Sequence, residues 1–148
     1  MFGIVCTSDC LSHARAIADC LEDCAILDFD TVLADPSAFE VPENLGIVFS
    51  REDQGIPAKV ASFIKDVLGN ADLEGMKYMF SVCVCDKPYH ALRIVEMLCA
   101  KQGCAPSLSI AMKDASEAPE IARKIESGDI VLAGSGIGTV IYMKRHKI

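Results

Sequence analysis

The sequence predicts an α/β fold in which helices cover both faces of a parallel sheet. The sequence has five apolar runs rich in β-branched residues, and the central ones are nearly continuous, which is typical of strands buried on both faces. Helical segments alternate with these runs, so right-handed crossovers give an open, doubly wound sheet. The 148 residues suit a single domain built around one core, and no internal repeat or linker divides them.

The first half of the chain contains three expected strands and one expected helix. The strand at residues 2–6 precedes a helix at 11–21, in which apolar residues recur at helical spacing. Further strands are expected at 25–29 and 45–50. Between these two strands, residues 30–44 hold two prolines and little apolar sequence, which predicts a loop with a brief turn of helix.

The second half of the chain continues the alternation. A proline opens the first of its helices, where the missing N–H costs nothing, and a glycine follows the end of each helix. Asp114 or Ser116 is expected to cap the last helix. The expected elements are a helix at 57–68, a strand at 78–85, a helix at 89–101, a strand at 107–112 and a helix at 116–126.

Composition and charge exclude several classes of function. No apolar run is long enough to cross a membrane, and the start lacks the features of a signal peptide, so we expect a cytoplasmic protein. The formal charge of −7 disfavours nucleic acid as a partner. Residues 139–148 are expected to form an extended basic tail, either solvated or docked on a neighbouring subunit. A homodimer through its apolar segment, residues 140–143, is one hypothesis.

Ligands of such sheets bind beyond the carboxyl ends of the strands, where the strand order reverses. Three loops are expected there, at residues 7–13, 50–56 and 86–90. They follow the first, third and fourth strands, so we expect the binding site among their side chains.

Two stretches of the chain resemble the flavodoxin family, and most closely its short domains in anaerobe-type flavodoxin and ferredoxin fusions. The first is Gly46-Ile47-Val48-Phe49, then Gly55-Ile56-Pro57 leading into Phe63-Ile64, and the second is Lys77-Tyr78-Met79-Phe80-Ser81-Val82-Cys83-Val84-Cys85, then Ala91-Leu92. The resemblance implies a three-layer sandwich with a five-stranded parallel sheet in the order 2-1-3-4-5. It also implies an FMN cofactor and electron transfer to a redox partner protein.

In that family the FMN phosphate lies on the first loop. Thr7, Ser8 and Ser12 supply hydroxyls there, and the helix start adds amide donors and a favourable dipole. His13 is able to donate one N–H to an anion. Asp9 would place a negative charge beside a phosphate, and the alternative is that Asp9 or Ser12 caps the helix.

The second loop departs from the family. The positions of the aromatic residues that flank the flavin ring fall on Glu52 and Gln54, which do not stack as rings do. Ser50, Arg51 and Gly55 remain candidate cofactor-binding residues. Arg51 suits a phosphate or carboxylate, or else a surface ion pair.

The third loop and the cysteines offer further chemistry. Tyr89 is placed to stack on a flavin, or to serve as an ordinary aromatic at a helix start. The chain has eight cysteines and no C-x₂-C pair, which indicates reduced thiols. Cys6, Cys10 and Cys85 border the expected cleft, and the helix start beside Cys10 is expected to lower its thiol pKa.

Three hypotheses follow for the function. The chain is a flavodoxin-like protein that binds FMN and carries electrons; or it is a binding or regulatory module on the same scaffold without flavin; or Cys10 and Cys85 form a thiol-based redox or metal site.

Overall fold

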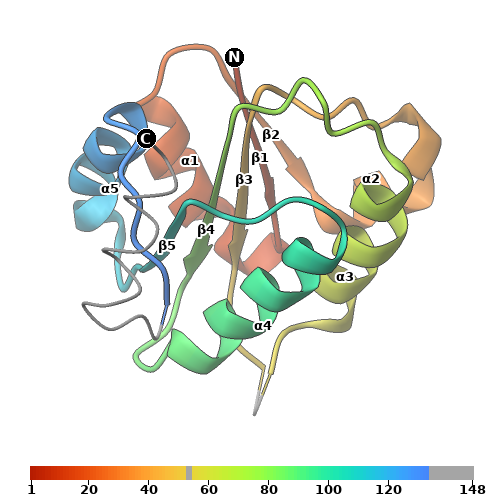
Figure 1. Ribbon diagram of the computed structural model, residues 1–148. Helices are drawn as coiled ribbons and strands as arrows, with labels where there is room; N and C mark the ends of the chain where they lie inside the picture. The colour runs from red at the N-terminus through yellow and green to blue at the C-terminus, as the bar shows by residue number, and fades with distance from the viewer. Residues whose placement is uncertain (53–54, 134–148) are drawn as a thin grey trace.

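The structure, a computed structural model, describes residues 1–52 and 55–133 (Figure 1). Its sheet has five parallel strands in the order β2-β1-β3-β4-β5, which confirms the predicted order. The strands are β1 (Phe2–Cys6), β2 (Cys24–Asp28), β3 (Asn44–Phe49), β4 (Tyr78–Cys83) and β5 (Leu108–Ala111).

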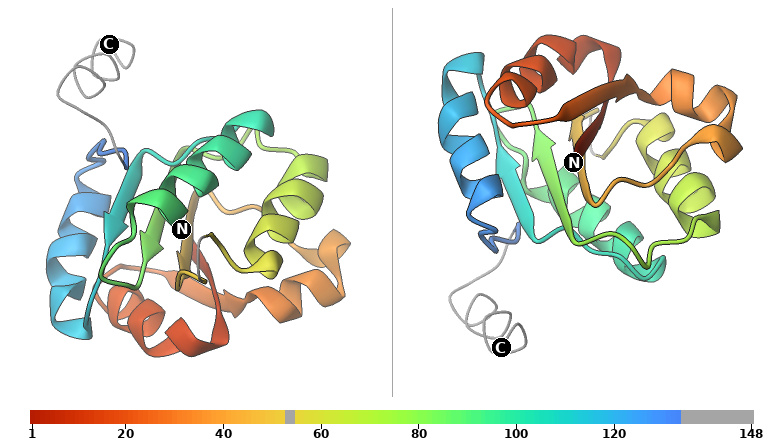
Figure 2. Two further views of the ribbon diagram at one scale, coloured as in Figure 1. Left: turned by 90° about the horizontal axis from the view of Figure 1, so that it is seen from below. Right: turned by 90° about the horizontal axis from the view of Figure 1, so that it is seen from above.

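Helices cover both faces of the sheet and make three layers (Figure 2). On one face, α1 (Leu11–Asp19) packs beside α5 (Ala118–Glu126). The other face carries α2 (Phe29–Ala34), α3 (Ala58–Ser62) and α4 (Tyr89–Lys101). Each face has its own buried apolar cluster, so the central strands are buried on both sides as their continuous apolar sequence predicts.

The bounds of the observed elements differ from the predicted bounds mainly at the ends of strands. Phe29 begins α2 instead of ending a strand, because Asp28 caps the helix by accepting a hydrogen bond from the Thr31 amide at 2.7 Å. Strand β4 ends at Cys83, so residues 84 and 85 belong to the following loop. The segment 30–44 forms α2 and one 3₁₀ turn, in agreement with a loop carrying a brief helix.

The structure refines the prediction for two helices, one in its winding and one in its start. The predicted helix at 57–68 changes winding, with a π-helical segment (Phe63–Val67) and a 3₁₀ turn (Leu68–Asn70) after α3. A capping box at Asp114 and Glu117 starts the turn before α5, which confirms the cap expected at Asp114.

Some expectations fall outside the described residues. The basic tail at 139–148 and the apolar segment at 140–143 lie there. Within residues 1–52 and 55–133, no helix combines the length and apolar character needed to cross a membrane.

Strand β3 tolerates no side chain at Gly46. Gly46 pairs with Phe80 of β4, and the Phe80 ring lies over the glycine in the cluster beneath α1 and α5. A β-carbon at this position would overlap the ring, which is fully buried and would have to shift within a close-packed core.

Replacing Gly46 with alanine is therefore expected to destabilise the protein by about 2–3 kcal/mol, because the core becomes overpacked. Urea unfolding followed by circular dichroism measures this change. Gly75→Ala is the control, since no atom lies within 4 Å of a β-carbon built there. Equal stability of G46A and G75A would show that the Phe80 contact does not constrain the sheet.

Candidate functional site

The three expected loops meet at the carboxyl edge of the sheet, and two hydrogen bonds connect them. Ser50 Oγ donates to Asp9 Oδ2 at 2.6 Å, which joins the second loop to the first. Arg51 Nη1 donates to the Lys87 carbonyl oxygen at 3.4 Å, which joins the second loop to the third. Parallel strands with matched register bring these loops together, although they are far apart in the sequence.

In the first loop, Thr7 is extended and is followed by a 3₁₀ turn, Ser8–Cys10, that leads into α1. Thr7 is 4% exposed, and its Oγ1 is buried without a hydrogen bond of normal geometry, although it lies close enough to Asp9 to affect that carboxyl. Ser8 and Ser12 are exposed. A buried hydroxyl normally has a partner, so Thr7 Oγ1 has hydrogen-bonding capacity to spare.

Asp9 is an ionised carboxyl in this loop. The hydrogen bond from Ser50 lowers its pKa most, and the Thr7 hydroxyl lowers the pKa further. The prediction that Asp9 or Ser12 caps the helix is wrong: Cys10 stands at the N-cap of α1, and no side chain caps it. The 3₁₀ turn places Asp9 ahead of the helix, where it meets Ser50 instead.

His13 lies on the side of α1 that approaches α5. Its charge contributes to the lowered pKa of Asp114, although the hydrogen bond from Ser116 is the main cause. The ring is half-buried, and its Nδ1 has no hydrogen-bond partner. His13 therefore lies near the start of α5.

The second loop is a tight turn at its tip. Glu52 and Gly55 exchange two backbone hydrogen bonds, at 3.2 and 2.7 Å, and Gly55 is half-buried. Arg51 and Glu52 are exposed. Gln54, the other position aligned with a ring-flanking aromatic residue, lies outside the described residues.

The third loop presents an exposed aromatic residue. Tyr89 is the first residue of α4 and is 65% exposed, so its ring is free to cover a ligand. Cys85, at the start of the loop, is half-buried.

The structure reverses the expectation for the Cys10 thiol. Burial raises the pKa of Cys10, and burial raises the pKa of Cys6 to about 11. Cys10 is 1% exposed, so the cost of desolvating a thiolate exceeds the benefit of the helix start. Among the described residues, no three His, Cys, Asp or Glu side chains are grouped to hold a metal ion. The thiol contact recorded at this edge joins Cys83 and Cys85, not Cys10 and Cys85.

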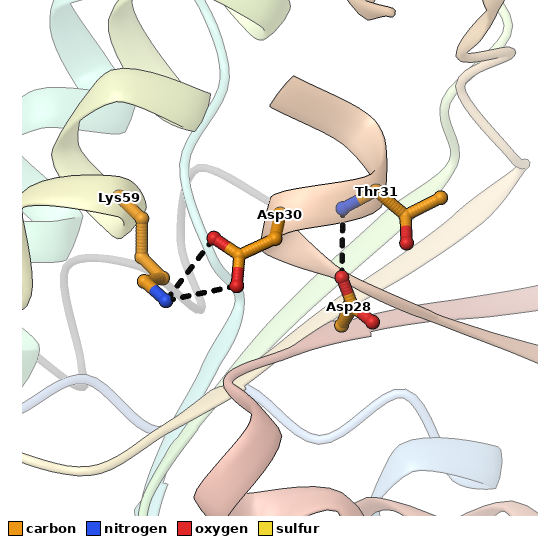
Figure 3. Close-up of polar contacts among 4 residues, drawn as sticks. All are labelled: Asp28, Asp30, Thr31 and Lys59. Carbon is orange, nitrogen blue, oxygen red and sulfur yellow. Dashed lines mark hydrogen bonds and ion pairs between the residues drawn. The ribbon is translucent and has the colours of Figure 1, made fainter. Parts of the chain in front are cut away.

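Sequence reasoning missed a charged group beside the site. Lys59 Nζ contacts both carboxylate oxygens of Asp30, at 3.1 and 3.2 Å, and Asp28 caps α2 next to this pair (Figure 3). The Lys59 charge also contributes to the lowered pKa of Asp9, less than the hydrogen bonds do. The sequence feature that could have indicated this charge is the position of Lys59 in the first turn of the helix that follows the second loop.

Two cavities lined by described residues lie away from this edge. One, of about 680 Å³, lies between residues 36–41 and 66–72. A second, of about 220 Å³, lies beside β1 and β2, where Phe39 and Pro42 cover Gly3.

The sheet order and the three loops at its carboxyl edge define a flavodoxin-like α/β protein. No protein-family model and no curated protein matches the sequence. Solved structures do match its fold. The flavodiiron core of Flv1 from Synechocystis sp. superposes with a TM-score of 0.58 at 11% identity, covering 86% of this chain and 36% of that one.

Two further structures match over nearly their whole length. A flavodoxin from the domain Archaea gives a TM-score of 0.56 at 17% identity, covering 85% of this chain and 99% of its own. General stress protein 14 from Treponema denticola, solved in complex with FMN, gives 0.53 at 11% identity, covering 85% and 95%. These likenesses show the flavodoxin-like fold of this chain.

The Ser50–Asp9 hydrogen bond leads to a pH prediction. Because the folded-state pKa of Asp9 is lowered, its contribution to stability is present at neutral pH and is lost as pH falls through the folded pKa. Ser50→Ala is expected to raise the Asp9 pKa and to remove no more than about 1 kcal/mol of stability at pH 7, because Asp9 is exposed.

Carboxyl carbon NMR measures the Asp9 titration directly. Ser8→Ala is the matched control, since the Ser8 hydroxyl is exposed and does not contribute to the lowered pKa of Asp9. An Asp9 pKa that is unchanged in S50A would show that this bond does not form in solution.

Proposed function

We propose that the chain binds FMN at the carboxyl edge of its sheet and passes electrons to a redox partner protein. The observation that carries the proposal is the Thr7 hydroxyl, which is buried at the start of the first loop and makes no hydrogen bond of normal geometry there. The FMN complex of a protein with the same fold supports it.

The residues at the edge fit the phosphate end of FMN. Thr7 Oγ1 is available to donate to a phosphate oxygen, and the exposed hydroxyls of Ser8 and Ser12 stand on either side of the turn that starts α1. Asp9 opposes a phosphate by its charge, but Ser50 draws its carboxylate toward the second loop. Lys59 offsets part of that charge.

At the ring end the fit depends on the third loop. Tyr89 is exposed at the start of α4 and suits stacking on a flat apolar ring. Arg51 holds the second loop against the third through the Lys87 carbonyl, which keeps the two walls of a ring site together. FMN, when bound, supplies the redox chemistry, and the protein binds and orients it.

A second candidate function is a binding or regulatory module that holds no flavin. The observation that favours it is again Asp9: an ionised carboxylate already stands in the first loop and ties that loop to the second. Glu52 adds another exposed acid near the place of the ring. Both charges oppose a dianionic phosphate and an anionic reduced flavin.

Thr7→Val tests the flavin proposal, because it removes the hydroxyl and keeps the shape. We expect the wild-type protein to quench FMN fluorescence at saturation, and T7V to weaken FMN binding by roughly tenfold, as loss of a hydrogen bond to a charged group implies. Riboflavin lacks the phosphate, so its binding is expected to be the same in both proteins.

Ser127→Ala, at the far end of α5, is the control for nonspecific effects of losing a hydroxyl. If wild-type protein leaves FMN fluorescence unchanged at saturating protein concentration, the flavin proposal is wrong and the second candidate function stands.

Asp9→Asn also distinguishes the two candidate functions, because it is expected to strengthen FMN binding where Thr7→Val weakens it. Asparagine keeps an acceptor for Ser50 and removes the charge, so D9N is expected to tighten FMN binding by about fivefold, corresponding to about 1 kcal/mol of removed repulsion. Binding of riboflavin is expected to stay unchanged. Isothermal titration calorimetry measures both constants, and equal FMN affinities in D9N and wild type would show that Asp9 does not face the phosphate.

A further inference from the structure

We propose that Cys83 and Cys85 form a reversible dithiol–disulfide pair at the carboxyl end of β4. Their Sγ atoms lie 3.6 Å apart. The two cysteines are two residues apart in the sequence, on either side of the point where β4 ends. This inference does not depend on flavin binding.

The backbone around the pair allows the thiols to approach each other. Strand β4 ends at Cys83, and Cys85 lies in the bend that follows, so regular strand geometry does not hold the two side chains apart. The Val84 amide donates to the Phe49 carbonyl at 2.8 Å and anchors the residue between them. Since a disulfide is about 2.05 Å long, the sulfur atoms need to approach by roughly 1.5 Å.

The two thiols differ in accessibility, which assigns them different roles. Cys83 is 0% exposed, whereas Cys85 is half-buried at the surface of the third loop. An oxidant from solution therefore reaches Cys85 first, and Cys83 is placed to react from inside. Burial raises the pKa of Cys83, so its thiol stays protonated until that second step, and the nearby Arg51 charge partly opposes the shift.

The reaction balances with a small disulfide, such as oxidised glutathione, as the oxidant. The Cys85 thiol loses its proton and attacks one sulfur of the disulfide, forming a mixed disulfide and releasing one thiolate. The Cys83 thiol then loses its proton and attacks Cys85 Sγ, which forms the Cys83–Cys85 bond and releases the second thiolate. Two electrons pass from the protein to the small disulfide, which is reduced to two thiols.

Another cysteine pair provides an internal comparison. Cys99 and Cys104 interact at the end of α4, but they are 0% and 7% exposed and belong to the apolar core. These two thiols are close together, but both are buried, so neither is accessible to an oxidant in the way that Cys85 is. We expect this second pair to stay reduced in the folded protein.

Mass spectrometry of the full chain tests the proposal, because trypsin isolates the pair. Cleavage after Lys77 and Arg93 gives a peptide, residues 78–93, whose cysteines are Cys83 and Cys85 alone. The folded protein is equilibrated at defined ratios of reduced to oxidised glutathione, alkylated and digested. We expect this peptide to become unalkylated and lighter by two hydrogen atoms as the ratio falls, and to return to the dithiol with dithiothreitol.

Two variants assign the roles of the thiols. Cys83→Ala is expected to accumulate a glutathione mixed disulfide on Cys85, and Cys85→Ala is expected to leave Cys83 unmodified in the folded state. Cys104→Ala is the matched control and should leave oxidation of the 78–93 peptide unchanged. Circular dichroism checks that each variant folds, and the wild-type measurement stands without the variants.

The proposal is overturned if the 78–93 peptide of folded wild-type protein remains alkylated at both cysteines at every ratio. It is also overturned if wild-type protein stops at the mixed disulfide on Cys85, because Cys83 then fails to resolve it.

Discussion

Burial of β3 and β4 on both faces is the constraint on which the rest of the structure depends. Helices on each side must cover these strands. Because the strands are parallel, the loops that lead from a strand to the next helix all lie at the carboxyl edge of the sheet. Close packing across the sheet sets the register, most tightly where the Phe80 ring lies over Gly46. The positions of the candidate site residues follow from that register.

Within the site, the loops are held by contacts with one another as well as by the strands. Ser50 reaches Asp9, and Arg51 reaches the backbone at Lys87. Because the second loop supplies both donors, it couples the first loop to the third. A ligand that enters between the loops has to be accommodated by these two bonds, or replace them.

Electrostatics give the site two opposed features. Thr7 offers a buried hydroxyl that makes no hydrogen bond of normal geometry, as an anion site would require, while Asp9 keeps a negative charge in the same loop. The same edge carries the Cys83–Cys85 contact, which is independent of any phosphate. Anion binding and thiol exchange are thus distinct kinds of chemistry, supported by different atoms of neighbouring loops.

The sequence by itself determined the architecture and indicated where the candidate site lies. Continuous apolar runs predicted buried parallel strands, and hydroxyl, charged and cysteine residues after three of them located the loops. These are local patterns, which can be read from residues that are close together in the chain.

The tertiary structure alone decided which side chains meet. Asp9 and Ser50 are 41 residues apart, and Lys59 and Asp30 are 29 apart, so no local pattern pairs them. Burial likewise arises from packing by distant segments: it raised the pKa of Cys10, where the helix start alone suggested the opposite, and it covered the Thr7 hydroxyl. Desolvation depends on everything that surrounds an atom, and the sequence states only what precedes and follows it.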